Sequence, residues 1–159
     1  MTDQSVCFRP IGVLHSPFTE RVGTPIQGAF APQATGTVEV LEEFAEGLDD
    51  LDGFSHLYLI YAFDRSDGFR LKVAPFRDDT PRGVFATRAP SRPNQIGLSI
   101  VRLLRREGNV LHVAEVDFLD GTPLLDIKPY VPRFDHRDGC RSGWLEQSQD
   151  RTAADDRFA

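Results

Sequence analysis

The strongest constraint on the fold of this chain is a hairpin signal in its second half. Two strand-like runs, residues 98–106 and 110–119, flank the tripeptide Glu107-Gly108-Asn109. Glycine and asparagine tolerate the positive φ angles of tight hairpin turns, so this segment predicts two adjacent antiparallel strands. A second turn signal, Asp120-Gly121-Thr122-Pro123, follows and precedes the apolar residues 124–127.

The remainder of the chain contributes more strands than helices. Residues 36–41 alternate as a strand does, and residues 54–63 are almost continuously apolar or aromatic, which favours a strand buried on both faces. Residues 42–51 carry apolar side chains at helical spacing and predict one short helix. Many short strands with regular turns favour a mostly β fold, a small closed antiparallel β-barrel with one or two short helices.

A chain of 159 residues is long enough for one domain with a hydrophobic core. It contains no apolar run of membrane-spanning length, and its first residues lack a secretion signal, so we expect a cytoplasmic protein without a membrane partner. Cys7 and Cys140 are then expected to be reduced thiols. After Pro132 the sequence turns polar, and residues 150–159 are expected to form a loose tail.

Charge is unevenly distributed along the chain. The net charge is −6, but residues 70–106 carry nine basic and two acidic side chains, whereas residues 1–60 carry two basic and nine acidic ones. This basic segment is either a solvated face paired with the acidic first third or a surface that faces a polyanion.

Residues 83–99 combine stiffness with positive charge. Pro90 and Pro93 lack amide donors and hold their neighbours in extended geometry, and the same loop contains Arg88 and Arg92. A stiff loop loses little entropy when a ligand docks, so this segment predicts a binding loop. Alternatively, Arg92 only clamps the loop onto a carboxylate such as Asp117.

Several common site types have no support in the sequence. It contains no Gly-x-Gly-x-x-Gly, no P-loop motif and no Gly-x-Ser-x-Gly elbow. Its four histidines and two cysteines do not have the spacing of metal ligands, so we expect no metal.

Four segments, residues 11–18, 53–59, 83–99 and 116–130, together resemble the TrmO (TsaA-like) family, whose members methylate N6 of threonylcarbamoyladenosine beside the tRNA anticodon. The resemblance implies a β-barrel methyltransferase that is not of the Rossmann type. It also implies S-adenosylmethionine as cofactor, tRNA as partner and a homodimer. The barrel domain is then expected over residues 6–134, followed by a polar C-terminal extension and tail over 135–159.

Carried over position by position, the resemblance implies a cofactor pocket built from several loops. Ile26 stands where the family has an arginine, which removes one cation from the rim. The implied cofactor-binding residues are Pro25, Ile26, Gln27, Asp64, Arg65, Arg88, Leu98, Asp120, Gly121, Thr122, Pro123 and Leu124.

The chemistry of the cofactor suggests roles for some of these residues. A guanidinium suits the cofactor's carboxylate, so Arg88 or Arg65 is the candidate there. Asp64 could accept from ribose hydroxyls or the ammonium, and Leu98 could form an apolar wall for adenine. Asp126 and then Tyr130 are the candidate catalytic residues that take the proton, although Asp126 could equally be a turn-stabilising carboxylate.

Two functions from different classes remain open at this point. The first is an S-adenosylmethionine-dependent tRNA methyltransferase. The second is a non-catalytic barrel that binds S-adenosylmethionine or RNA and acts as a sensor or regulatory module.

Overall fold

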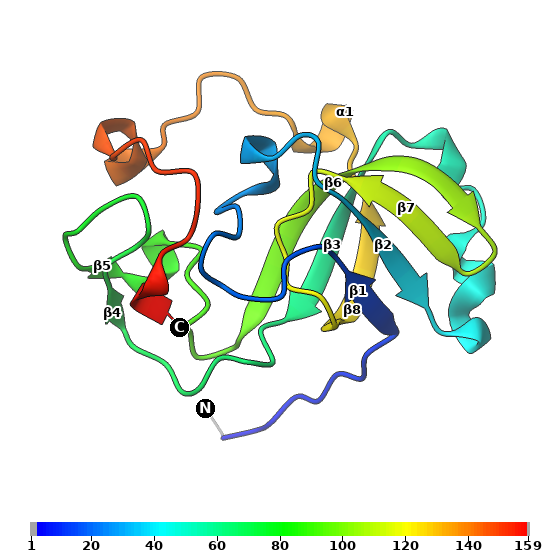
Figure 1. Cartoon of the computed structure of the whole chain (residues 1–159), viewed down its shortest axis with the longest axis horizontal. Coiled ribbons are helices and arrows are strands. Elements are labelled where there is room, and N and C mark those ends of the chain that lie inside the picture. The colour runs from blue at the N-terminus through cyan, green and yellow to red at the C-terminus, as the bar shows by residue number, and fades with distance from the viewer. Residues whose placement is uncertain (1–2, 159) are drawn as a thin grey trace.

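A computed structural model describes residues 3–158. Six antiparallel strands close into a barrel in the order β1–β2–β7–β6–β3–β8, which confirms the predicted fold (Figure 1). The strands are β1 (Gly12–His15), β2 (Thr35–Val40), β3 (His56–Ala62), β6 (Ile96–Glu107), β7 (Val110–Ala114) and β8 (Thr122–Pro129).

The predicted hairpin is formed by β6 and β7. Glu107 pairs with Val110 across the turn, and Gly108 adopts a φ of 61°, the left-handed conformation that the turn requires. The hairpin continues along the chain into β8, whose neighbours in the barrel are β1 and β3. The second turn signal lies just before β8, where Gly121 has a φ of 82°.

Two local expectations need correction. β3 is not buried on both faces, because its residues alternate between buried and half-buried as they do in any strand of a single barrel wall. Residues 42–51 form no regular α-helix but the 3₁₀ helices η2 (Glu42–Leu48) and η3 (Leu51–Gly53). Asp50, with a φ of 68°, separates the two.

Inward-facing side chains from all six strands form the core of the barrel. Leu14, Val38, Leu57, Leu59 and Leu111 are fully buried there. Their burial contributes about 1.5–3 kcal/mol for each side chain, so the barrel provides a rigid frame for the loops at its ends.

A small lobe stands beside the barrel (left side of Figure 1). It contains β4 (Lys72–Val73), β5 (Arg82–Gly83) and the 3₁₀ helix η4 (Val84–Ala86). Its separate small core consists of Val73, Val84 and Ala89 with Phe158 packed against them. Ala89 belongs to the loop around Pro90 and Pro93, which we call the proline-braced loop. This loop is therefore part of the lobe, and it leads directly into β6.

The C-terminal extension contains α1 (Pro132–Asp135), η5 (Gly143–Gln147) and η6 (Asp156–Phe158). We call residues 149–158 the C-terminal strap. The expectation of a loose tail is wrong through residue 158, since Ala153 forms a β-bridge with Pro25 and the Ala154 amide donates to the Thr24 carbonyl at 2.8 Å. Ala159 lies outside the described residues.

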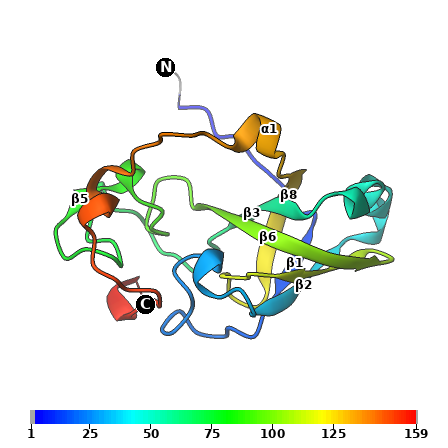
Figure 2. The ribbon, with the colours of Figure 1, turned by 90° about the horizontal axis from the view of Figure 1, so that it is seen from above.

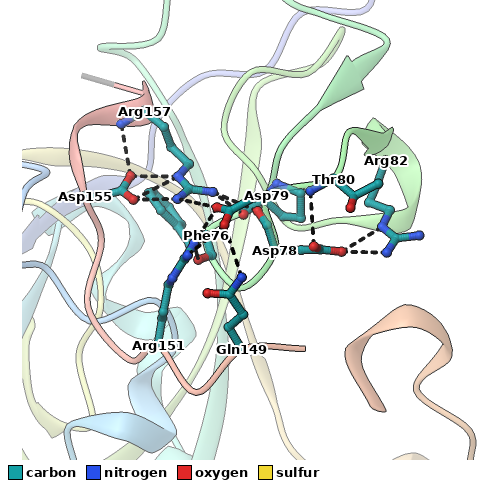
Figure 3. Close-up of polar contacts among 10 residues, drawn as sticks. Phe76, Asp78, Asp79, Thr80, Arg82, Gln149, Arg151, Asp155 and Arg157 are labelled. Atoms are coloured by element: carbon teal, nitrogen blue, oxygen red, sulfur yellow. Dashed lines mark hydrogen bonds and ion pairs between the residues drawn. The ribbon is translucent and has the colours of Figure 1, made fainter. Parts of the chain in front are cut away.

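Charged side chains fasten the strap to the lobe (Figure 3). Arg151 donates to both carboxylate oxygens of Asp79, and Arg157 lies 3.6 Å from the same carboxylate. The guanidinium of Arg157 also donates to the backbone carbonyls of Pro75 and Asp78. The strap thus bridges the loop after β1 and the lobe.

Two further observations concern the described residues. Cys7 and Cys140 are both free and exposed, as expected for reduced thiols. Within residues 3–158, every helix is too short or too polar to cross a membrane.

Candidate functional site

A cavity of about 540 Å³ lies between the barrel and the lobe. Five segments line it: residues 21–27, 61–66, 76–98, 117–122 and two residues of the strap, Ala154 and Phe158. Figure 2 shows the lobe and the barrel side by side, with the blue loop after β1 and the red strap close together between them. The size suits a small organic ligand.

Four arginines line the cavity, and two of them belong to the proline-braced loop. Arg88 donates to the side-chain oxygen of Gln27 at 2.6 Å and so connects the lobe to the loop after β1. Arg92 donates to the Thr87 and Ala89 carbonyls, each at 3.0 Å. Arg92 therefore clamps its own loop through backbone carbonyls rather than through Asp117.

The other two arginines join separate segments of the wall. Arg65 donates to the Asp120 carbonyl. Arg21 donates to the carbonyls of Arg65 and Phe158 and thereby ties the strap to the segment after β3. Among residues 3–158 neither guanidinium forms an ion pair, so this part of the cavity favours an anionic group.

Asp117 is a half-buried carboxylate of the site. Ser99 donates its hydroxyl to one oxygen, and the Gly28 amide donates to the other at 3.0 Å. Burial nevertheless dominates and raises the pKa of Asp117 to about 6. A cationic ligand group near this carboxylate would favour its ionised form.

Tyr61 forms an aromatic wall above Gly97, its partner across β3 and β6. A Cβ atom at position 97 would lie 2.1 Å from the Tyr61 ring, so only glycine allows this packing. The Tyr61 hydroxyl lies 2.9 Å from the Ser99 oxygen. Because the Ser99 hydroxyl donates to Asp117, the Tyr61 hydroxyl must donate to Ser99. Burial raises the pKa of Tyr61, so its hydroxyl keeps the proton that it donates.

Eight of the twelve cofactor residues expected from the resemblance line this one cavity. They are Pro25, Ile26, Gln27, Asp64, Arg65, Arg88, Leu98 and Thr122.

The other four do not line the cavity; they are Asp120, Gly121, Pro123 and Leu124. The Asp120 carboxylate accepts from His15 and the Ser16 amide, and Leu124 is fully buried in the barrel core. These contacts hold the loop between β7 and β8 in place. Asp120 contacts a cavity residue through its backbone carbonyl, which accepts a hydrogen bond from Arg65.

Asp126 and Tyr130 do not line the cavity. Asp126 pairs across strands with Ile60 and lies 3.2 Å from the Lys128 ammonium. The Tyr130 ring packs against Tyr58 with a centroid distance of 5.6 Å. Both residues lie on or beside the outer face of the barrel.

The cavity residues that were not predicted as site residues include Arg21, Asp117 and Phe158. Asp117 stands between the apolar Val116 and Phe118, and a carboxylate within such a run is a signal for a buried functional acid. Nothing local in the sequence marks Arg21 or Phe158, because Arg21 meets its partners Arg65 and Phe158 only through long-range folding and Phe158 reaches the cavity at the end of the strap.

The cavity can therefore hold a ligand with three chemical features. Its arginines suit an anionic group, Asp117 and Asp64 suit a cationic one, and Tyr61 with Leu98 suits an apolar or aromatic portion. Within residues 3–158, no three His, Cys, Asp or Glu side chains gather closely enough to hold a metal ion.

The comparisons with known proteins point to one family. The pattern of the tRNA-methyltransferase O N-terminal domain matches residues 13–136. A probable S-adenosyl-L-methionine-binding protein of Pyrococcus abyssi is 57% identical over 143 residues, covering 90% of this chain and 78% of the relative. The crystal structure of TrmO from Pseudomonas aeruginosa superposes with a TM-score of 0.76 at 41% identity, covering 90% of this chain and 62% of that one.

A tRNA (adenine(37)-N6)-methyltransferase of Mus musculus is 36% identical over 133 residues, covering 79% of this chain and 31% of the relative. This chain thus spans less than two thirds of the Pseudomonas TrmO chain and about a third of the mouse enzyme.

Proposed function

The chain belongs to the family of the tRNA-methyltransferase O N-terminal domain, and on that premise we propose that it is an S-adenosylmethionine-dependent tRNA methyltransferase. The observation that carries the proposal is the cavity, where four arginines and Asp117 surround an aromatic and apolar wall. The cofactor has the matching groups: a carboxylate, an ammonium, a sulfonium and an adenine. The acceptor we infer is N6 of threonylcarbamoyladenosine beside the tRNA anticodon, as the family resemblance implies.

Each part of the cavity has a role in this proposal. Arg88, whose position Gln27 fixes, would bind the cofactor's carboxylate. Asp117 would face its positive charge, and Leu98 with Tyr61 would enclose the adenine. Ile26, at the position of the family arginine, lines the same wall without adding charge.

When bound, S-adenosylmethionine supplies a methyl group that its positive sulfur has already activated. The chain's own task is then to align the acceptor and to exclude competing water. The acceptor nitrogen gives up one proton for each methyl group that it gains, and the proton leaves to a carboxylate or to solvent. Asp126 and Tyr130 remain the predicted proton acceptors.

The outer face of the barrel favours a homodimer. Leu98 and Ile100 on β6 are 45% and 42% exposed, and they pair with Ile60 and Tyr58 on β3. A second copy of this chain is the occupant we infer for this apolar face. Since Asp126 pairs with Ile60 on the same face, it would lie in or beside this interface.

The assay for the function has two stages. Calorimetry with S-adenosylmethionine measures cofactor binding, and mass spectrometry of tRNA nucleosides with and without the protein measures methyl transfer. We expect binding and a gain of one methyl mass on threonylcarbamoyladenosine. Binding with no methyl gain on any nucleoside would instead indicate a regulatory S-adenosylmethionine-binding module, and no binding would refute the cofactor assignment.

The dimer has its own test. Ile100 lies outside the cavity lining, so Ile100→Glu should produce a monomer in light scattering without removing a cofactor contact. Leu71→Glu, at an exposed position of the lobe, is the matched control and should leave the dimer intact. A wild-type monomer at micromolar concentration would refute the dimer.

A further inference from the structure

A second cavity of about 560 Å³ adjoins the first. The two share a wall that contains Ile26, Gln27, Phe85 and Arg88. The lobe supplies most of the remaining lining, and η5 closes it with Trp144 and Leu145. The proposed cofactor site lies in the first cavity, and the proposed function assigns no ligand to the second.

The two cavities differ in charge. Asp64 and Asp117 line the first, whereas no acidic residue is among the described residues that line the second. The charged residues of its lining are Arg77 and Arg88; Arg77 lies 3.8 Å from the fully exposed carboxylate of Asp150, which is outside the lining, so the lining itself is positive. A cationic cofactor therefore suits the first cavity, and an aromatic ligand with an anionic group suits the second.

The second cavity is also unusually aromatic. Phe30, Phe76, Phe85 and Trp144 line it, and the Arg77 guanidinium lies 5.0 Å from the centroid of the Phe30 ring. Unpaired nucleic-acid bases stack on aromatic rings and on guanidinium planes. This combination of side chains is therefore suited to a base and its phosphate.

Phe85 and Trp144 stand out among these rings. Phe85 is 76% exposed at the border of both cavities, which is an unfavourable place for a phenylalanine unless a ligand covers it. Trp144 is held in place, since its indole nitrogen donates to the Ala86 carbonyl at 2.8 Å and Arg82 lies 5.6 Å from its ring centroid. Both rings line the second cavity and so are available to a planar ligand there.

We propose that the second cavity binds the acceptor base of an unpaired RNA segment, with Phe85 and Trp144 as its stacking surfaces. Arg77 then binds an anionic group of the acceptor, either a phosphate or a carboxylate on the base, while Arg88 in the shared wall binds the cofactor. The proposal rests on the proposed function, because methyl transfer requires the acceptor beside the donor, and the shared wall provides that proximity.

Trp144 is the only tryptophan of the chain, so its fluorescence reports on this cavity directly. The probe is an RNA hairpin with adenosines in its loop, and a fully paired RNA duplex of the same composition is the control ligand. We expect saturable quenching by the hairpin and much less by the duplex. Quenching by an acidic peptide but not by the hairpin would overturn the proposal and assign the cavity to a protein partner.

Variants separate this proposal from the proposed function. Because the Trp144 variants lack the intrinsic fluorophore, their hairpin affinity is measured by the anisotropy of a dye-labelled hairpin. Trp144 does not line the first cavity, so Trp144→Ala should weaken hairpin binding at least about fivefold and leave the dissociation constant for S-adenosylmethionine unchanged. Trp144→Phe should recover most of the RNA affinity, and Phe69→Ala, an exposed ring of the lobe outside both cavities, should change neither. Unchanged RNA affinity in Trp144→Ala overturns this inference alone, whereas failure of the wild type to bind S-adenosylmethionine overturns the proposed function.

Discussion

The guanidinium of Arg151 donates two hydrogen bonds, 2.9 and 3.1 Å long, to the carboxylate of Asp79, a residue 72 positions earlier in the sequence. These bonds lower the pKa of Asp79 to about 2. Since the strap places Ala154 and Phe158 in the cavity wall, a contact between two residues outside the lining helps to shape the cavity.

Asp79→Asn should weaken S-adenosylmethionine binding, because the strap would lose its main charged anchor on the lobe. We expect a loss of about three- to tenfold in calorimetry, as such an exposed network contributes modestly. Asp156→Asn removes the same charge from an exposed position of the strap and serves as the control. Equal affinities in both variants would show that the strap holds without Asp79.

The strap should also respond to pH through the Asp79 carboxylate. The folded pKa of Asp79 is about 2, below the ordinary value, so its ionised form stabilises the fold above about pH 4. This contribution should disappear as the pH falls from about 4 to about 2. NMR amide signals of Gly23 and Ala154, which the strap pairing protects, should change in that window and not between pH 5 and 7.

The contribution of Asp117 to the free energy of unfolding should have the opposite dependence on pH. Its folded pKa of about 6 exceeds the unfolded value, so the folded state holds the proton more strongly and stability falls as the pH rises from about 4 to about 6. The full decrease is about 3 kcal/mol. Urea unfolding from pH 4 to 7 measures it, and Asp117→Asn should flatten the curve in this range. A wild-type curve without this slope would mean that Asp117 is ionised at ordinary pH.

Arg88→Ala should lower cofactor affinity strongly. The variant loses a guanidinium that Gln27 already orients toward the cavity, and the loss of one charged hydrogen-bond donor costs about 2 kcal/mol, or roughly 30-fold. Arg70→Ala is the control, since Arg70 belongs to the same lobe, is exposed and lies outside the lining. If both variants bound the cofactor as the wild type does, the assignment of the proline-braced loop would be wrong.

Gly97→Ala should destabilise the barrel and deform the cavity together. The added methyl group would overlap the Tyr61 ring, which its bond to Ser99 holds in place, so we expect a loss of about 1–3 kcal/mol in urea unfolding. Gly83→Ala is the matched control, because a Cβ atom there meets nothing within 4 Å and the φ of −56° suits alanine. A Gly97→Ala variant as stable as the wild type would show that Tyr61 can move freely.

Local signals in the sequence were sufficient for much of the fold. The turn at Gly108 and the alternation in β6 and β7 predict the hairpin, because both depend on neighbouring residues. The strap was missed for the opposite reason: its residues are polar, and what orders them is a carboxylate 72 residues away. Burial of β3 was overestimated, since an apolar run does not show which of its side chains will face outward.

The site was predicted to a similar extent. Arg88 and Leu98 follow from the resemblance and line the cavity, whereas Asp126 and Tyr130 lie on or beside the outer face of the barrel. Asp117 has one sequence signal, its place between Val116 and Phe118, but its contacts with Ser99 and Gly28 depend on long-range folding and could not be predicted.

The cavity is bordered by five segments, from Arg21 near the start of the chain to Phe158 in the strap. A ligand bound there acts as a reversible tether that adds to the polar contacts between these parts of the chain and to the packing of Phe158 against the lobe. Its binding energy therefore adds to the cohesion of the whole molecule and increases with ligand concentration. For such a protein, the supply of its methyl donor also sets how firmly the lobe, the strap and the barrel stay together.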